Sequence, residues 1–382
     1  FTAGYNYERI GGDASDNAVS MNTSMVSDDN KAGMYLYGSY RNRQPYDHNS
    51  DGFSEVTKQL NHTMGMRSYY RLSSQSKLTL EYHNIHEFRR GGNDFHLQPH
   101  QTDITEQVEH ETNGGGIAYN WYSPDARQKL NIYTSLQQVL RQSYYGAGQN
   151  PDAYGNTGNL TAVTGAQYVY NFNNLLFMPS ELTVGSEYQY DDLYDKMPGY
   201  GRNIKQTTRV VGFFLQNEWK NKDMNILLGG RLDKHNLLDK AVFSPRITMK
   251  YNFNPNLNWR GSYAAGFRAP QAFEEDLHVD AAGGIMKLIE LSDNLRPEYS
   301  HSLSTSLDYY FKLGNTEVNL LAEGFHTRIN DIFILTEIGL SPDGHIIVER
   351  QNGSGGQVSG INFEGKIAPS TRLQLQFGYT LQ

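Results

Sequence analysis

The chain has 382 residues, a formal net charge of −8 and a mean hydropathy of −0.63. It holds no run of roughly eighteen apolar residues, which excludes a helical membrane protein. The acidic balance argues against a nucleic-acid partner, and the absence of cysteine excludes disulfides, thiolate metal sites and thiol catalysis.

The aromatic and glycine content favours a protein built of many strands. Tyrosine occurs 27 times against 3 tryptophans, and 37 glycines accompany them. Amphipathic rings suit positions where hydrocarbon meets water, as in a membrane β-barrel; a large soluble β-protein is the alternative. No linker or shift in composition divides the chain, so we expect residues 1–382 to form one architecture.

Apolar and polar residues alternate with a period of two along most of the chain, which predicts about seventeen strands. The pattern is clearest at 243–270, where Ile247, Met249 and Tyr251 alternate with polar residues before a turn at 252–256. In chain order, the predicted strands lie near residues 1–10, 18–27, 32–41, 57–71, 77–88, 104–121, 128–144, 160–172, 181–192, 205–220, 223–235, 241–253, 257–267, 299–312, 316–330, 358–367 and 371–382.

The connectors between these strands alternate in length. Short turns are predicted at 28–31, 73–76, 123–126, 221–222, 254–256, 313–315 and 369–370, and long loops at 42–56, 89–103, 145–159, 193–203, 269–298 and 331–357. This parity is typical of a transmembrane antiparallel β-barrel of the outer membrane, with turns in the periplasm and loops outside the cell. Three connectors depart from it: 10–17 and 236–240 are short for loops, and 171–179 is long for a turn.

The two faces of the predicted strands differ as those of a barrel wall do. Leu303, Leu307 and Tyr309 alternate with Ser304, Ser306 and Asp308, so we expect the apolar set to face lipid and the polar set to face the lumen. A barrel must also pair its last strand with its first. Seventeen is odd, and the chain ends within a strand pattern, so we expect further strands after Gln382.

Several motifs in the second half of the chain resemble TonB-dependent outer-membrane receptors. In order, they are Gly212-Phe213-Phe214-Leu215-Gln216-Asn217-Glu218-Trp219, Gly230-Arg231-Leu232-Asp233, Phe243-Ser244-Pro245-Arg246, Ser262-Tyr263-Ala264-Ala265-Gly266-Phe267-Arg268-Ala269-Pro270, Leu295-Arg296-Pro297-Glu298 and Gln357-Val358-Ser359-Gly360-Ile361-Asn362-Phe363-Glu364. The resemblance is firmest over 205–382. Residues 86–92, with Pro99 and His100, resemble receptors of Bacteroidetes-type bacteria.

The resemblance implies a barrel of about twenty-two strands around a globular plug. Residues 1–382 would then be a partial barrel domain, with a plug preceding Phe1 and about five strands following Gln382. It also implies TonB-driven uptake of a scarce, bulky nutrient through outer-membrane lipid, most often an iron-siderophore. Cobalamin, haem, other chelates and oligosaccharides are alternatives, and a passive porin-type channel is the rival class. The TonB complex would act through a segment absent from this sequence, and a surface lipoprotein is a further candidate partner.

The candidate ligand residues lie in predicted loops or at strand ends. The segment from His83 to His110 holds five of the 12 histidines, and His96 and His100 in it lie beside Arg89 and Arg90. Histidine could bind a metal or haem iron, and arginine could pair with carboxylates or catecholates, although a solvated loop explains them as well. We also consider Tyr144, Tyr145 and Tyr154 as stacking residues, and Arg268 as a lumenal contact to substrate or plug. Residue type alone makes these side chains candidates.

Two short segments of the chain, 47–55 and 274–276, are rich in acidic residues. Asp47, Asn49 and Asp51 match the first half of a calcium-binding loop, with Gly52 at the turn and Glu55 as a further oxygen ligand. The twelfth position is Lys58, so the loop is not an EF-hand, and an ordinary polar turn is the alternative. Glu274, Glu275 and Asp276 read as a solvated face, and no motif positions a nucleophile or a base, so we expect no enzyme.

Overall fold

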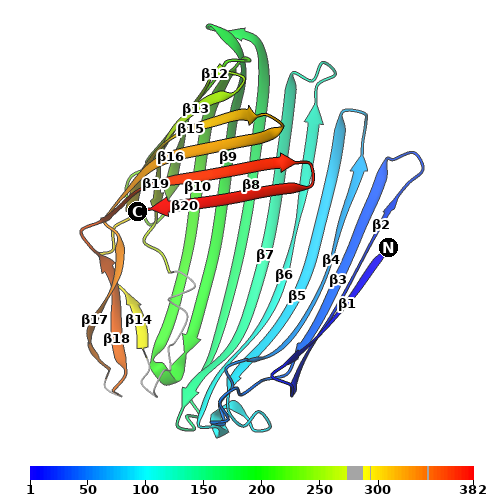
Figure 1. Ribbon diagram of the computed structural model, residues 1–382. Helices are drawn as coiled ribbons and strands as arrows, with labels where there is room; N and C mark the ends of the chain where they lie inside the picture. The colour runs from blue at the N-terminus through cyan, green and yellow to red at the C-terminus, as the bar shows by residue number, and fades with distance from the viewer. Residues whose placement is uncertain (273–286, 293, 342–343) are drawn as a thin grey trace.

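The computed structural model describes residues 1–272, 287–292, 294–341 and 344–382. In this part of the chain, seventeen strands pair antiparallel with their neighbours in chain order to form one sheet (Figure 1). They are β1 Thr2–Ile10, β2 Ala14–Val26, β3 Ala32–Arg43, β4 Lys58–Arg71, β5 Ser76–Gly92, β6 Ile104–Tyr122, β7 Gln128–Ala147, β8 Tyr154–Leu175, β9 Met178–Met197, β10 Arg202–Lys220, β11 Met224–His235, β12 Val242–Asn254, β13 Leu257–Arg268, β15 Glu298–Leu313, β16 Thr316–Asn330, β19 Gly356–Ser370 and β20 Leu373–Leu381.

Every one of the predicted strands is present in this sheet, and the parity of the connectors is stronger than expected. The connectors at the upper end of Figure 1 are 27–31, 72–75, 123–127, 176–177, 221–223, 255–256, 314–315 and 371–372. The predicted long turn at 171–179 was wrong, because β8 and β9 continue to a connector of only Leu176 and Phe177. We call this the turn end, and the opposite end the loop end.

The predicted loops at 145–159 and 193–203 were also wrong over most of their length. β7 continues to Ala147, β8 begins at Tyr154, β9 continues to Met197 and β10 begins at Arg202. Antiparallel pairing satisfies the backbone donors and acceptors of these segments, so the hairpins remain strands beyond the part that crosses a membrane. β10 pairs with β11 only from Val210 onwards, so its first eight residues project past β11.

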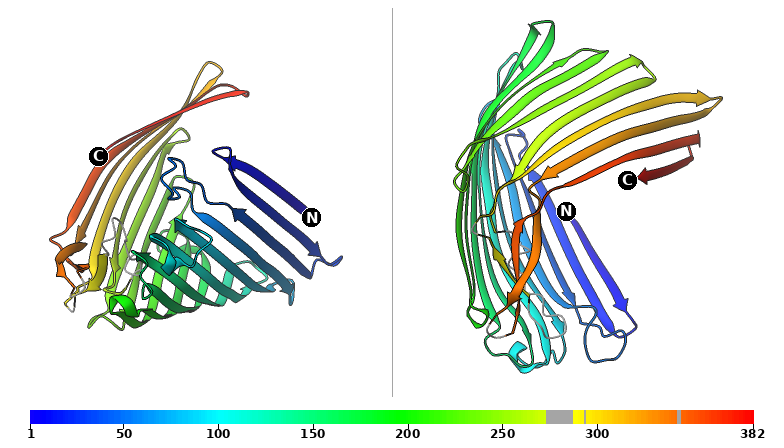
Figure 2. Two further views of the ribbon diagram at one scale, coloured as in Figure 1. Left: turned by 90° about the horizontal axis from the view of Figure 1, so that it is seen from below. Right: turned by 90° about the vertical axis from the view of Figure 1, so that its left-hand side faces the viewer.

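The sheet curls into an open trough with β1 and β20 at separate edges (Figure 2). Within the described residues, no pairing joins these two strands. The convex face carries the apolar side chains, as predicted: Leu303 is 57% exposed and Leu307 is 48% exposed, whereas Ser304 and Ser306 on the other face are half-buried. The concave face is therefore the polar lumenal wall.

A second, three-stranded sheet lies at the loop end, at the lower left of Figure 1. It consists of β14 Lys287–Leu291, β17 Phe333–Leu340 and β18 Ile346–Asn352, with β14 parallel and β17 antiparallel to β18. The sequence predicted long loops with no strands at 269–298 and 331–357, and the three strands of this sheet correct that prediction. The two loops are paired with each other through β14 and β18, where Ile289 is the partner of Val348.

Two short 3-10 helices lie at the loop end, η1 Pro99–Gln101 and η2 Pro198–Tyr200. No helix in the described part of the chain is long and apolar enough to cross a membrane. The acidic run Glu274, Glu275 and Asp276 lies outside the described residues.

Candidate functional site

The inner face of the projecting hairpins β7–β8 and β9–β10 carries a buried charged cluster. Asp195 is 1% exposed and forms ion pairs with Arg202 at 2.7 Å (Nε to Oδ2) and with Arg141 at 3.5 Å (Nη2 to Oδ1). Thr157 Oγ1 donates to Asp195 Oδ1 at 2.5 Å, and Arg141 Nε donates to Thr157 Oγ1 at 3.1 Å. Burial lowers the pKa of Arg202, and the charge of Asp195 opposes that shift. These contacts tie the four strands β7 to β10 together at the loop end, beyond the part of the wall that crosses the membrane.

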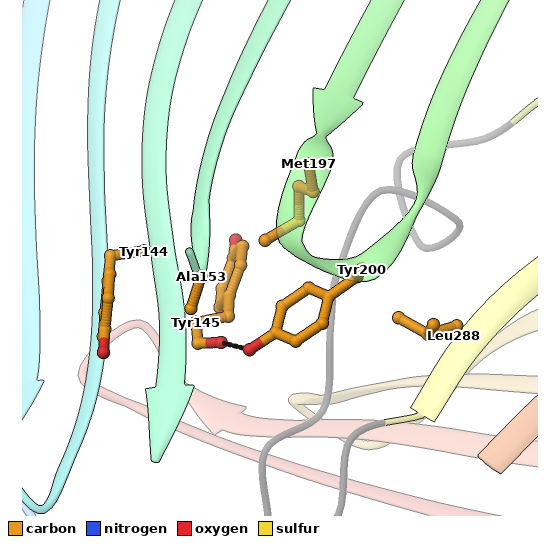
Figure 3. Close-up of a cluster of buried hydrophobic side chains, with 6 residues drawn as sticks. All are labelled: Tyr144, Tyr145, Ala153, Met197, Tyr200 and Leu288. Atoms are coloured by element: carbon orange, nitrogen blue, oxygen red, sulfur yellow. Dashed lines mark hydrogen bonds between the residues drawn. The ribbon is translucent and has the colours of Figure 1, made fainter. Parts of the chain in front are cut away.

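Apolar side chains pack beside this cluster and attach the small sheet to the wall. Tyr145, Ala153, Met197 and Tyr200 form a buried group with Leu288 of β14 (Figure 3). Tyr200 Oη donates to the Tyr145 carbonyl oxygen at 2.5 Å, and burial raises the pKa of Tyr200 to about 12. A neighbouring group joins Leu193 and Ala272, with Ile204 and Leu291 packed against them. The chain following β13 and the strand β14 therefore lie against the inner face of the β9–β10 hairpin.

Two adjoining grooves run along the inner wall between these contacts and the membrane. The larger, of about 510 Å³, is lined by polar groups that include Glu187, Asp191, Arg231, Asp233 and His235. The second, of about 380 Å³, lies nearer the charged cluster and includes His110, Arg141 and Thr157. Asp191 and Gln271 line both, so the two form a continuous polar surface that a ligand entering from the loop end would meet.

The polar groups of these grooves are held by specific partners. Asp191 accepts hydrogen bonds from Asn159 Nδ2 at 2.9 Å and from Thr161 Oγ1 at 2.7 Å. Arg231 Nε donates to Asp233 at 2.7 Å, and its Nη2 donates to Glu187 at 3.3 Å. Such fixed side chains can orient a bound ligand without first paying the entropy of ordering themselves.

His235 at the end of β11 is a neutral histidine in a fixed tautomer. Its Nδ1 accepts the backbone N–H of Leu237 at 3.1 Å, so its Nε2 carries the proton and faces Gln271 Oε1 at 3.3 Å. Burial lowers the pKa of His235, and the contact with Gln271 partly opposes that shift. His235 as a whole is 2% exposed and is therefore part of the wall that supports the groove.

The predicted aromatic residues divide between the two faces of the wall. Tyr144 and Tyr154 are cross-strand partners whose rings meet edge-to-face at 4.8 Å, and His100 Nδ1 lies 2.8 Å from Tyr154 Oη. Tyr145 lies on the opposite, inner face, because adjacent strand residues point to opposite sides. The structure thus brings Tyr144, Tyr154 and His100 together on the outer side, away from the grooves.

The predicted charged residues are spread over the loop end. Arg89 forms an ion pair with Glu87, and Arg90 is buried, donates to the Leu97 and Asp94 carbonyl oxygens and stacks over Phe95. Arg90 therefore organises the loop that contains the exposed His96. Arg268 at the end of β13 lies over the ring of Phe333, at the start of the small sheet. Ligand binding by these residues stays a prediction.

The predicted calcium loop brings its carboxylates together. Asp47, Asp51 and Glu55 each offer an oxygen within 4.8 Å of the others. The same oxygens accept backbone donors: Ser50 N and Gly52 N each lie 2.7 Å from Asp47, and His48 N lies 2.6 Å from Glu55. Asn49 donates to Asp51 at 3.0 Å. Oxygen donors of this kind suit Ca²⁺, and they equally stabilise the turn alone.

Sequence reasoning missed the charged cluster and the groove residues. Arg141, Asp195 and Arg202 lie on three strands and match no local motif, so their meeting depends on strand register. Period-two alternation does place Asp191, Asp195 and Asp233 on the polar face of their strands. The alternation therefore shows which face of the sheet a residue lies on, but it does not identify which polar residues of that face are buried.

The fold and the two-faced wall define the class of this protein: it is a bacterial outer-membrane β-barrel with an elaborated loop end. The chain matches the family model described as TonB dependent receptor-like, beta-barrel, over residues 1–382. It therefore belongs to the TonB-dependent receptor family, as the sequence motifs indicated. Members of this family are receptors and transporters, not enzymes.

Individual relatives share little sequence identity with this chain. The siderophore receptor PirA of Pseudomonas aeruginosa is 13% identical with a TM-score of 0.76, covering 99% of this chain and 64% of that one. The ferric enterobactin receptor PfeA of the same species is 13% identical with a TM-score of 0.73, covering 100% and 62%. The iron-regulated outer membrane virulence protein of Vibrio cholerae is 32% identical over 133 residues, which are 34% of this chain and 20% of that protein. The chain thus spans under two thirds of these solved structures, and their likeness establishes the fold.

Proposed function

We propose that the chain forms the barrel wall of a receptor that takes up an iron chelate, most simply a ferric siderophore, across the outer membrane. The observation that carries the proposal is the continuous polar surface on the inner wall, which lies at the loop end where an external ligand arrives. The match to an iron-regulated outer-membrane protein, and a fold shared with siderophore receptors, support iron as the cargo.

Family membership supports energy coupling through TonB and contact with outer-membrane lipid as parts of the same proposal. Cobalamin, haem and other chelates remain alternative cargoes of the same mechanism, and a surface lipoprotein remains a candidate partner. Transport needs no covalent chemistry, so the wall has to bind, orient and release. Calcium bound by Asp47, Asp51 and Glu55 would order the loop 44–57 beside the entrance.

The test is uptake by cells that carry the full-length gene and lack their own siderophore receptors. Under iron limitation, we expect accumulation of radioactive iron from one class of ferric siderophore, and loss of that accumulation when TonB is deleted. Cobalamin and haem serve as competing cargoes in the same assay. Entry of small solutes without TonB, and of no chelate, would instead identify a passive channel.

The position of the binding surface is tested by neighbouring residues on opposite faces. Asp191 lines both grooves, whereas Asp192 is on the outer face and accepts a hydrogen bond from Thr207 Oγ1 at 2.6 Å. We expect Asp191→Ala to weaken binding of the transported chelate by about tenfold or more, the value of one polar contact of about 1.4 kcal/mol. Asp192→Ala should leave affinity unchanged. Equal effects of the two substitutions would contradict the proposed surface.

A further inference from the structure

Two histidines and two glutamates meet on the outer face of β4, β5 and β6, on the opposite side of the sheet from the grooves. His62 and His86 are direct cross-strand partners, and their rings stack with centroids 4.6 Å apart at an angle of 15°. His86 pairs across the next strand with Glu111, and Glu109 is two residues further along the same face. Three adjacent strands (blue to cyan in Figure 1) thus place four possible metal ligands side by side.

The carboxylates flank both nitrogens of one ring. His86 Nδ1 lies 3.3 Å from Glu111 Oε2, and His86 Nε2 lies 3.6 Å from Glu109 Oε1. Asn84 Nδ2 donates to the other oxygen of Glu111 at 2.5 Å, which fixes that carboxylate beside the ring. Two carboxylates facing one imidazole create a local preference for positive charge, which a bound cation can supply.

The remaining ring is open to solvent. His62 is exposed, and none of the hydrogen bonds of the described residues involves its ring nitrogens. The side chain of His86 is 19% exposed, and those of Glu109 and Glu111 are 44% and 43% exposed. A cation can therefore reach all four groups from outside.

The position along the wall keeps the group out of the hydrocarbon. β5 begins at Ser76 by the turn end, and its lipid-facing residues Leu80 and Tyr82 are each 43% exposed. His86 follows on the same face as the eleventh residue of the strand, where a tilted strand of about 9–11 residues has completed its crossing. The group therefore lies at the outer boundary of the membrane, where water and ions have access.

We propose that His62, His86, Glu109 and Glu111 form a surface site for a divalent first-row transition ion such as Zn²⁺. Imidazole nitrogen and carboxylate oxygen are the donors that this ion prefers in the absence of thiolates. The two carboxylates balance its charge, and the cross-strand pair supplies both imidazoles. The four donors do not yet converge on one point, so binding requires rotation of the exposed glutamate side chains and of the His62 ring.

This donor set differs from the oxygen-only set at Asp47, Asp51 and Glu55. Hard oxygen ligands suit Ca²⁺ and Mg²⁺, whereas imidazole selects transition ions. The two groups can therefore be separated by the choice of probe. Cu²⁺ is the best reporter here, because its paramagnetic resonance spectrum counts the bound nitrogens.

The experiment titrates the detergent-purified protein with Zn²⁺ and Cu²⁺ alone, with no siderophore present. We expect one Zn²⁺ site, and a Cu²⁺ spectrum with two coupled imidazole nitrogens. His62→Ala should reduce the nitrogen count to one and weaken Zn²⁺ binding by at least about tenfold, since even outer partners of metal ligands contribute 10–100-fold. Glu109→Gln with Glu111→Gln should weaken binding while keeping both nitrogens.

His83→Ala is the matched control, because His83 lies on β5 three residues away and points to the inner face. It should leave the stoichiometry, affinity and spectrum unchanged. His62 is exposed, so its removal leaves the fold intact, and the migration of the unheated protein on a gel verifies this. Absence of Zn²⁺ binding in the wild type, or binding that His62→Ala and the double glutamine variant leave unaltered, would overturn the proposal.

Discussion

Asp195 should be the most sensitive charged residue of the projecting hairpins. It is 1% exposed and lies between Arg141 and Arg202, which are themselves 5% and 8% exposed, with Thr157 donating a further hydrogen bond. Asp195→Asn preserves the shape and removes the shared negative charge. Breaking a buried ion pair in this way costs about 3–5 kcal/mol, because the remaining charges stay buried without their counter-charge.

The cost should appear as local opening and not as loss of the whole barrel, since the cluster lies above the membrane-crossing part of the wall. Hydrogen exchange measured by mass spectrometry should report it. A cost of about 3–5 kcal/mol corresponds to exchange that is roughly 10²-fold to 4 × 10³-fold faster in residues 193–206, with exchange in β12 and β13 unchanged.

The control for Asp195 is an exposed ion pair. Lys312 and Glu317 lie 2.8 Å apart at the turn end, with side chains 69% and 67% exposed. Glu317→Gln should leave exchange unaltered, because solvent screens such pairs. If Asp195→Asn were as silent as Glu317→Gln, the buried cluster would not hold the hairpins together.

Three further predictions concern pH and calcium. Burial lowers the pKa of His235 below its ordinary 6.5, so the stability that this histidine contributes is full above pH 6.5 and falls on acidification. The thermal unfolding midpoints at pH 7.5 and pH 5 should therefore differ less in His235→Gln than in the wild type. An equal difference in the two proteins would contradict this. Burial raises the pKa of Tyr200 to about 12, so the stability that this tyrosine contributes is lost between about pH 10 and 12. Tyr200→Phe should remove that loss in thermal unfolding, and it should cost about 1 kcal/mol at neutral pH because the hydrogen bond to the Tyr145 carbonyl oxygen is absent. An unchanged alkaline profile would refute this. Ca²⁺ should slow hydrogen exchange in residues 44–57 of the wild type and not of Asp47→Ala; no effect on the wild type would leave the loop an ordinary turn.

The wall was predictable because its signal is repetitive. Apolar and polar residues alternate along most of the strands of the large sheet. Because one face of a barrel wall contacts lipid, the alternation predicts that Leu303 faces outward and Ser304 faces the lumen, as the structure shows. The turn at Leu176 and Phe177 was misplaced because Asn173 and Asn174 near the end of β8, and Pro179 near the start of β9, are residue types typical of loops. Such boundaries depend on pairing, which a single sequence does not display.

The loop end was less predictable because its contacts join distant segments. The parallel pairing of β14 with β18 links Ile289 to Val348, and no local pattern specifies that partner. Tyr145 was assigned to a loop, although it belongs to β7, where Tyr144 and Tyr145 are adjacent and therefore point to opposite faces. The charged cluster likewise follows from the register of β8 with β9, which sets Thr157 opposite Asp195.

The orientation of the wall in the outer membrane is the claim on which the proposed uptake depends, and cysteine accessibility tests it most directly. The chain has no cysteine, so Glu337→Cys on the exposed face of β17 and Asn256→Cys in the 255–256 turn each introduce a single thiol. In intact cells with the full-length protein, a membrane-impermeant maleimide should label Glu337→Cys at once. Asn256→Cys should react only after the outer membrane is permeabilised. Labelling of Asn256→Cys in intact cells, with Glu337→Cys protected, would contradict the account.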